Sequence, residues 1–185
     1  MDAIARTDGK ELLMPMHLDD VDVLPETAGV RSALIVPCNM CPAVTVAVNE
    51  GKPFLQLFRG LLRSPPFERH IEALRSRLRQ RGVDTKVFRS RLYHHWFMCM
   101  WPAARRRKLE RESENFDAVI VLGCDTATET VRQAAAASGC RVIEGMAFGG
   151  LMNAKLRFRW PGEVTFEDCR VIPLTRHTPD AVASA

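Results

Sequence analysis

The sequence predicts an α/β fold built on one parallel sheet, and two observations support this prediction. Short apolar runs rich in β-branched residues, typical of buried strands, recur at 32–36, 83–88, 117–123 and 141–143. Helical patterns or helix-start signals lie between these runs, as expected for parallel strands joined by right-handed crossovers. We therefore expect a flavodoxin- or Rossmann-like sheet with strand order 2-1-3-4, counted along the chain, followed by a C-terminal β-hairpin.

The first predicted strand runs directly into the motif PCNMCP at 37–42. Pro42 suits the first turn of a helix, where a missing backbone N–H costs nothing, so a helix is expected from 42 to 49 and, with breaks, to 58. Cys41 then lies near the N-cap and Cys38 just before it. The positive end of the helix favours the thiolate form, which binds metals or attacks disulfides.

The second unit begins with a helix whose apolar residues recur every three or four positions, namely Phe67, Ile71, Leu74 and Leu78. Gly82 ends this helix, and the strand at 83–88 follows. The next stretch, RLYHHWFMCMW at 91–101, contains Cys99.

The third unit starts with a helix after Pro102 that carries the run RRRK, and its strand at 117–123 leads into Cys124. Thr126 and Glu129 have the spacing of a capping box, so a helix is expected from there to about residue 138. After the strand at 141–143, alternation at 155–160, a Pro-Gly turn and a second run at 164–172 predict the hairpin.

These patterns divide the chain into a loosely ordered acidic arm at 1–30, an α/β cysteine-site domain at 31–174 and a frayed tail at 175–185. The arm holds seven acidic residues against two basic ones, whereas residues 59–111 hold fifteen basic against four acidic. The basic stretch is either a solvated surface or a docking face for an acidic protein, a nucleic acid or an anionic cofactor.

The six cysteines indicate metal or redox chemistry if the protein is cytoplasmic, as we expect from the absence of a signal-like N-terminus. No apolar run approaches the ~18 residues that cross a bilayer, so no membrane association is expected.

Four cysteines follow strands that the predicted order makes neighbours. Because ligand sites of open α/β sheets lie at the carboxyl ends of the strands, we expect these thiols to converge on one site. The predicted metal and cofactor ligands are Cys38, Cys41, Cys99 and Cys124.

Other residue types are more simply explained by packing. Small core or hairpin roles suit Cys140 and Cys169, and core filling suits Met98 and Met100. His94 and His95 could bind a metal, but adjacent histidines in an aromatic stretch more often pack or face solvent. The aromatic residues Tyr93, Trp96 and Trp101 could shield a cluster, stack on bases or pack under a helix.

In the order of its motifs the chain resembles the delta subunit of methyl-viologen-reducing hydrogenases, a small iron–sulfur electron carrier. The similarity covers about residues 32–145 and rests on PCNMC at 37–41, Cys99 after the second strand, and VLGC at 121–124. It implies an iron–sulfur cluster and a redox partner. The second cysteine that this family carries a few residues after the third-strand cysteine is absent here, where residues 125–129 read DTATE.

Three functions follow from these observations. The first is an iron–sulfur protein (2Fe–2S or 4Fe–4S) that passes electrons to an acidic redox partner, more an accessory subunit than a stand-alone enzyme. The second is a thiol–disulfide or sulfur-transfer protein that uses Cys38 and Cys41. The third is a zinc-stabilised module whose basic face binds RNA or protein. A further alternative is an enzyme that binds a small molecule in the crevice, with Asp125 or Glu144 as general acid or base.

Overall fold

The computed structural model describes residues 11–56, 63–89, 97–159 and 162–173. Its strands fall into two four-stranded sheets, a parallel sheet in the order β4-β2-β5-β6 and an antiparallel sheet in the order β1-β7-β8-β3. The α/β class and the predicted parallel strand order are confirmed. The expectation of a single sheet is wrong.

The parallel sheet forms the core and carries helices on both faces. Its strands are β2 (Ser32–Pro37), β4 (Asp84–Val87), β5 (Ala118–Leu122) and β6 (Arg141–Glu144). The central strands β2 and β5 pair from Ala33↔Ala118 to Pro37↔Leu122, and their side chains are almost all fully buried. Burial on both faces explains why these strands read as continuous apolar runs in the sequence.

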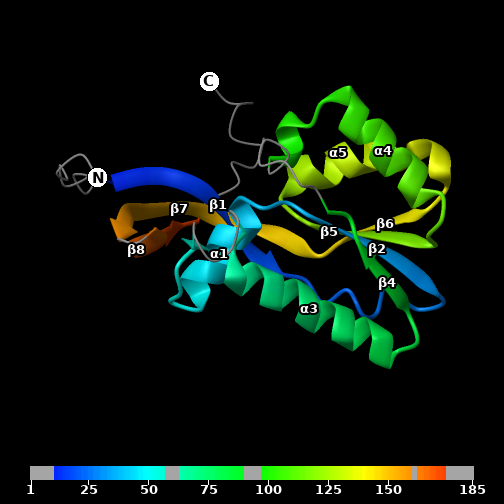
Figure 1. Ribbon diagram of the computed structural model, residues 1–185, viewed down its shortest axis with the longest axis horizontal. Coiled ribbons are helices and arrows are strands. Elements are labelled where there is room, and N and C mark those ends of the chain that lie inside the picture. Colours follow the sequence, from blue (N-terminus) through cyan, green and yellow to red (C-terminus); the bar gives the residue numbers. More distant parts are fainter. Residues whose placement is uncertain (1–10, 57–62, 90–96, 160–161, 174–185) are drawn as a thin grey trace, which may run out of the picture.

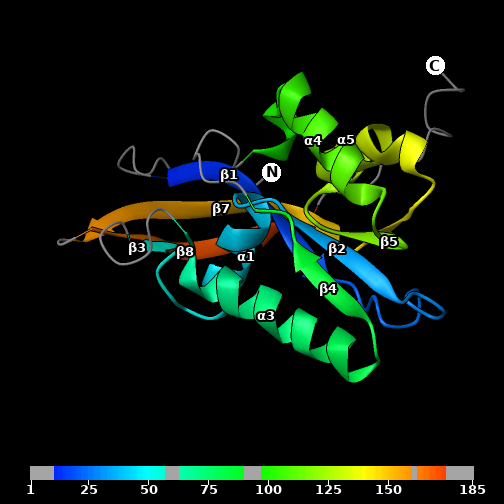
Figure 2. The same ribbon diagram turned by 45° about the vertical axis from the view of Figure 1, so that its right-hand side comes forward.

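Figure 1 and Figure 2 show α3 below the parallel sheet and α4 and α5 above it. The α-helices are α1 (Cys41–Asn49), α3 (Pro65–Gln80), α4 (Ala103–Ser113) and α5 (Asp125–Ala135), and two short 3-10 helices are η2 (Met98–Met100) and η3 (Ala136–Ser138). The predicted apolar stripe of α3 is buried, as expected. None of the helices in these described segments combines the length and apolarity that crossing a bilayer requires.

The antiparallel sheet is the main departure from the expected fold. Its strands are β1 (Glu11–Asp20), β3 (Leu55–Gln56), β7 (Met146–Arg159) and β8 (Glu163–Ile172). The predicted hairpin exists as β7 and β8, but β7 begins nine residues earlier than the alternation at 155 indicated. The segment at 55–56, expected as the end of a broken helix, is instead the strand that pairs with β8.

Residues 11–20 were expected to belong to a loosely ordered arm, and this expectation is wrong. They form β1, which pairs with β7 from Glu11↔Lys155 to Asp20↔Met146. Register shifts between Leu13 and Met16 and between His17 and Leu18 interrupt this pairing. Residues 1–10 and the tail from 174 lie outside the described residues.

Candidate functional site

Cys38 and Cys124 leave neighbouring strands at the same level of the sheet. The register pairs Pro37, the last residue of β2, with Leu122, the last residue of β5. The Cys38 backbone N–H also donates to the Leu122 carbonyl oxygen at 2.8 Å, which extends the ladder by one step. The adjacency expected for these two cysteines therefore follows from the parallel pairing of β2 with β5.

Gly123 allows the loops after β2 and β5 to approach each other closely. A Cβ at this position would lie 2.5 Å from the Ala127 Cβ and 3.5 Å from the Cys38 Cβ. Any larger residue would push α5 away from the end of β5. The glycine thus sets the distance between Cys38 and the first turn of α5.

Each of the two helices that follow these strands begins at a cysteine. Cys41 is the first residue of α1, with Met40 at the N-cap and a proline in the first turn. Cys124 is the N-cap of α5, and no side chain caps that helix, so the capping box expected from Thr126 and Glu129 is wrong. The positive ends of both helix dipoles are consequently close to these sulfur atoms.

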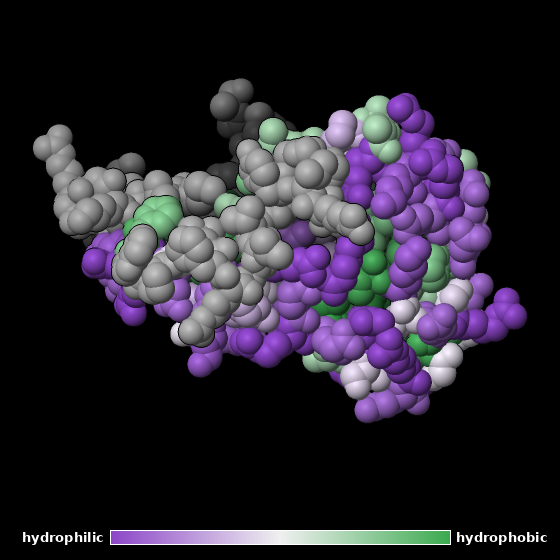
Figure 3. Space-filling view, viewed as in Figure 1, coloured by the Kyte–Doolittle hydropathy of each residue, from purple (hydrophilic) through white to green (hydrophobic). Residues whose placement is uncertain are grey.

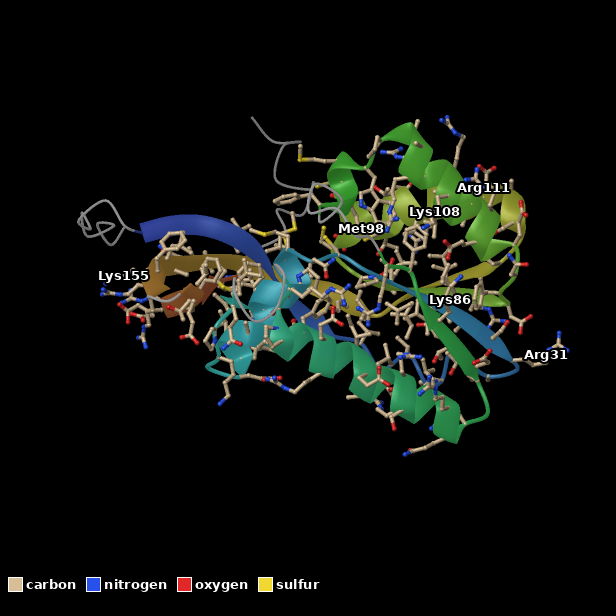
Figure 4. The ribbon with its side chains drawn as sticks, in the orientation of Figure 1. Arg31, Lys86, Met98, Lys108, Arg111 and Lys155 are labelled. Carbon is tan, nitrogen blue, oxygen red and sulfur yellow. The ribbon has the colours of Figure 1, made fainter. Side chains whose placement is uncertain are left out.

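Cys99 reaches the site on a separate segment, the short helix η2. Met98 is completely buried, and its backbone N–H donates to the Cys38 sulfur. Figure 4 shows Met98 near the beginning of α5. Cys99 follows Met98 directly but is exposed, so η2 is anchored at one residue and open to solvent at the next.

The pKa of Cys38 responds to Cys41 and Cys124, and the pKa of Cys41 responds to Cys124 and Cys99. Burial raises the pKa of the Cys38 thiol to about 12, and negative charge on Cys41 or Cys124 raises it further. Burial also raises the pKa of the Cys41 thiol, as does negative charge on Cys124 or Cys99. Cys41 is thus the centre of the group, since its thiol interacts with each of the other three.

Backbone N–H groups from three segments oppose this effect of burial. Met98 and Met40 donate to the Cys38 sulfur, and Met16 donates to the Cys41 sulfur. Hydrogen bonds to a sulfur favour its thiolate form and lower its pKa. The site therefore offers dipoles that can stabilise negative charge, although burial keeps the pKa of Cys38 and that of Cys41 raised.

The second sheet contributes directly to the site through β1. The hydroxyl of the buried Thr45, on α1, accepts a hydrogen bond from the Leu18 N–H at 3.2 Å and donates to the Met16 carbonyl at 3.4 Å. These bonds fix α1 against β1, which brings the Met16 N–H to Cys41. Sequence reasoning missed this contribution, although the alternation Leu12, Met14, Met16, Leu18 was a strand signal.

A buried arginine supports the segment that carries Cys99. The Arg105 guanidinium carbon lies 4.0 Å from the centre of the Phe88 ring and 5.1 Å from that of Trp101. Burial lowers the pKa of Arg105, and its Nε atom has no hydrogen-bond partner among the residues that the structure describes. The sequence had placed this arginine on a solvated or docking face, which is wrong because cation–π stacking on two rings draws it inward.

The other candidate residues are not part of this group of thiols. Cys140 follows η3 near the amino end of β6, where its sulfur contacts the Ser138 hydroxyl at 2.9 Å, and Cys169 belongs to β8. Glu144 forms an ion pair with Arg132 at 2.7 Å, and Asp125 opens α5. Met98 is buried as expected, but Met100 is exposed. His94, His95, Tyr93 and Trp96 lie outside the described residues.

Within the described part of the chain, no group of three or more His, Cys, Asp or Glu side chains converges tightly enough to hold a single metal ion. The four thiols are gathered at one edge without forming a closed tetrahedral cage. Comparisons of the chain with protein-family models, with curated proteins and with solved structures found no match. The resemblance to hydrogenase delta subunits stays a prediction.

Proposed function

We propose that this protein is an iron–sulfur electron-transfer protein whose cluster is held by Cys38, Cys41, Cys99 and Cys124. The observation that carries the proposal is the gathering of four thiols, from three loops, at the carboxyl edge of the parallel sheet. A bound cluster would supply one-electron redox chemistry there.

The electrostatics of the site support a cationic metal centre. A thiol that is buried as deeply as Cys38 keeps its proton at neutral pH, because burial raises its pKa to about 12. Metal ions displace thiol protons and stabilise the resulting thiolates. The N–H groups of Met98, Met40 and Met16 are then positioned to donate to the ligand sulfurs, an interaction that tunes the potential of iron–sulfur clusters.

A single zinc ion is the alternative metal for the same thiols. Zinc takes four sulfurs at about 2.3 Å in a closed tetrahedron. Metal analysis distinguishes the two centres, because only the cluster contains iron and sulfide.

A thiol–disulfide function is the second candidate, because Cys38 and Cys41 are electrostatic neighbours at the start of α1. Attack on a disulfide requires a thiolate, and such cysteines have lowered pKa values. Burial raises the pKa of both Cys38 and Cys41. This candidate is therefore weaker than the cluster.

Purification without oxygen, followed by absorption spectroscopy and iron and sulfide analysis, tests the proposal. We expect a brown protein that contains iron and acid-labile sulfide. Replacement of Cys124 by Ser should abolish or strongly reduce the colour, whereas the control Cys169→Ser, in the other sheet, should retain it. Equal colour in both variants would refute the ligand assignment.

The same preparation separates the alternatives. A colourless protein with one bound zinc would identify the zinc-stabilised module. A metal-free protein in which Cys38 and Cys41 form a reversible disulfide would identify the thiol–disulfide function.

In this proposal the redox partner is an acidic protein. Electron carriers commonly associate through small interfaces with complementary charge, and this chain has a formal net charge of +4. The protein would then act as an accessory subunit that relays electrons.

A further inference from the structure

The four cysteines differ in their exposure to solvent. Cys38 and Cys124 are buried and Cys41 is half-buried, whereas Cys99 is exposed. The neighbouring Met100 is also exposed, with 72% of its surface accessible. A protein that exchanges electrons with this site at short range must therefore approach Cys99 and Met100.

Helix α4 begins three residues after Met100 and presents a basic surface beside it. Arg105, Leu109 and Ser113 are buried at a spacing of four, which turns the opposite side of the helix outward. That side carries Arg107 and Arg111, and Lys108 lies next to them; all three are exposed. Figure 3 shows hydrophilic residues over this part of the molecule, and Figure 4 shows Lys108 and Arg111 on α4.

The charges of α4 are poorly neutralised compared with those of α3. On α3, Arg69, Arg75, Arg77 and Arg79 all form ion pairs. On α4, Lys108 contacts Glu112 at 3.5 Å, but Glu112 also holds Lys86 at 3.1 Å. Arg107 and Arg111 have no ion pair with any residue that the structure describes. Their spacing of four places like charges side by side, which disfavours the helix.

The basic residues of 59–111 are neutralised to different extents within the fold. Residues 59–111 carry a large basic excess, but its α3 part is neutralised within the fold. Among the described residues of this stretch that lack an ion pair, Arg107 and Arg111 lie on α4, which begins three residues after the exposed Met100, while Arg63 and Arg81 flank α3. We infer that the η2–α4 face, made of Cys99, Met100, Arg107, Lys108 and Arg111, is the docking surface for an acidic redox protein. The inference rests on the proposed electron-transfer function.

The aromatic residues of this region favour a protein over a nucleic acid as the partner. Single-stranded RNA is bound by exposed rings on which bases stack. Trp101 and Phe88 are buried, and both are covered by the Arg105 guanidinium. Trp101 and Phe88 are thus unavailable for stacking, whereas the exposed Met100, followed in the chain by the cations of α4, suits a protein interface with an apolar centre and a charged rim.

Two double variants with equal total charge test the docking face. Arg107→Glu/Arg111→Glu reverses two charges on α4, and Lys52→Glu/Arg170→Glu reverses two exposed charges away from it. Each double variant takes the formal net charge from +4 to 0, since each reversal removes two units. The probe is a fluorescently labelled, strongly acidic plant-type ferredoxin, titrated with each protein at low and at high salt. Circular dichroism checks that each variant is folded.

We expect the α4 double variant to weaken ferredoxin binding at low salt by about tenfold or more, and the control double variant to change it by about twofold or less. High salt should remove the difference between them. Equal weakening by both double variants would mean that only net charge matters, which overturns the inference. Tighter, α4-dependent binding of single-stranded polyuridine than of ferredoxin would also overturn it, in favour of RNA.

Iron and sulfide analysis of the same preparations separates this inference from the proposed function. An iron-free protein whose ferredoxin binding still depends on α4 would refute the proposed function and support the docking face. An iron-loaded protein whose ferredoxin binding is unchanged by the reversal of Arg107 and Arg111 would refute the docking face alone.

Discussion

The Cys38 thiol shows how its surroundings prepare a single residue for a metal. Its side chain is buried between the ends of β2 and β5, which raises its pKa to about 12. Backbone N–H groups of Met98 and Met40 nevertheless point at the sulfur. The residue therefore holds a proton in the metal-free chain, and a metal that replaces the proton finds hydrogen-bond donors already in place.

The stability of the metal-free protein should consequently fall as pH rises from about 9 towards about 12. In this range the unfolded chain releases the Cys38 proton, whereas the folded chain retains it. Stability is thus fully present below the unfolded pKa and is lost between the two values, by at most about 1.4 kcal/mol per pH unit for one proton. Urea unfolding at several pH values measures this slope.

The variant Cys38→Ala provides the comparison. It should unfold with a shallower pH dependence over the same range, whatever its stability at neutral pH. Identical slopes for the variant and the original protein would show that Cys38 does not retain its proton in the folded state.

At the scale of elements, the site depends on the turn between β5 and α5. Gly123 lets α5 begin directly over the loop of Cys38, with no room for a Cβ beside Ala127. The neighbouring element α1 is held independently, through the Thr45 hydrogen bonds to β1. Two helix starts and one strand thus fix the relative positions of Cys38, Cys41 and Cys124.

Substitution of Gly123 by Ala should destabilise the protein by about 1–3 kcal/mol, the usual cost of overpacking, and should lower its iron content. The added Cβ would collide with Ala127 and displace the start of α5 together with Cys124. Urea unfolding and iron analysis measure the two effects.

A second substitution tests the cause. The double variant Gly123→Ala/Ala127→Gly removes the Ala127 Cβ, with which the added Cβ would collide, so it should regain iron. Ala127→Gly alone should cost about 1 kcal/mol through lower helix propensity and should keep its iron. A Gly123→Ala protein with normal stability and iron would contradict the importance of this turn.

At the scale of the whole molecule, β7 connects the two sheets. It leaves β6 after Gly145, whose carbonyl accepts a hydrogen bond from the Val21 N–H at 3.1 Å, and then pairs with both β1 and β8. The parallel sheet is covered by helices on both faces (Figure 2). The far end of the hairpin carries the exposed Phe158. Local stability should therefore decrease from the parallel sheet towards that end.

Hydrogen exchange followed by mass spectrometry checks this gradient. Amides of β2 and β5 should exchange most slowly, because these strands are central and fully packed. Among the strands, amides near Arg159 and Glu163 should exchange fastest. Equal protection in peptides from both regions would show that the two sheets unfold as one unit.

The cysteine arrangement could be predicted in part from local patterns. Apolar runs marked the parallel strands and helix signals marked the crossovers, and the expected flavodoxin-like order placed β2 beside β5, as the structure has them. The adjacency of Cys38 and Cys124 follows from that pairing. Whether these residues bind a metal stays a prediction.

Only the tertiary structure decided the other parts of the site. The pairing of β1 with β7 joins residues more than a hundred positions apart, and no local pattern specifies such a partner. This pairing brings the Met16 N–H to Cys41. In the same way, contacts with Phe88 and Trp101 turn Arg105 inward and leave Arg107 and Arg111 outside. The sequence by itself determined the parallel strands, the helices between them and the loops that carry Cys38, Cys41 and Cys124, because those depend on short-range periodicity. The strands of the second sheet, burial and hydrogen-bond partners depend on contacts that only the folded chain makes.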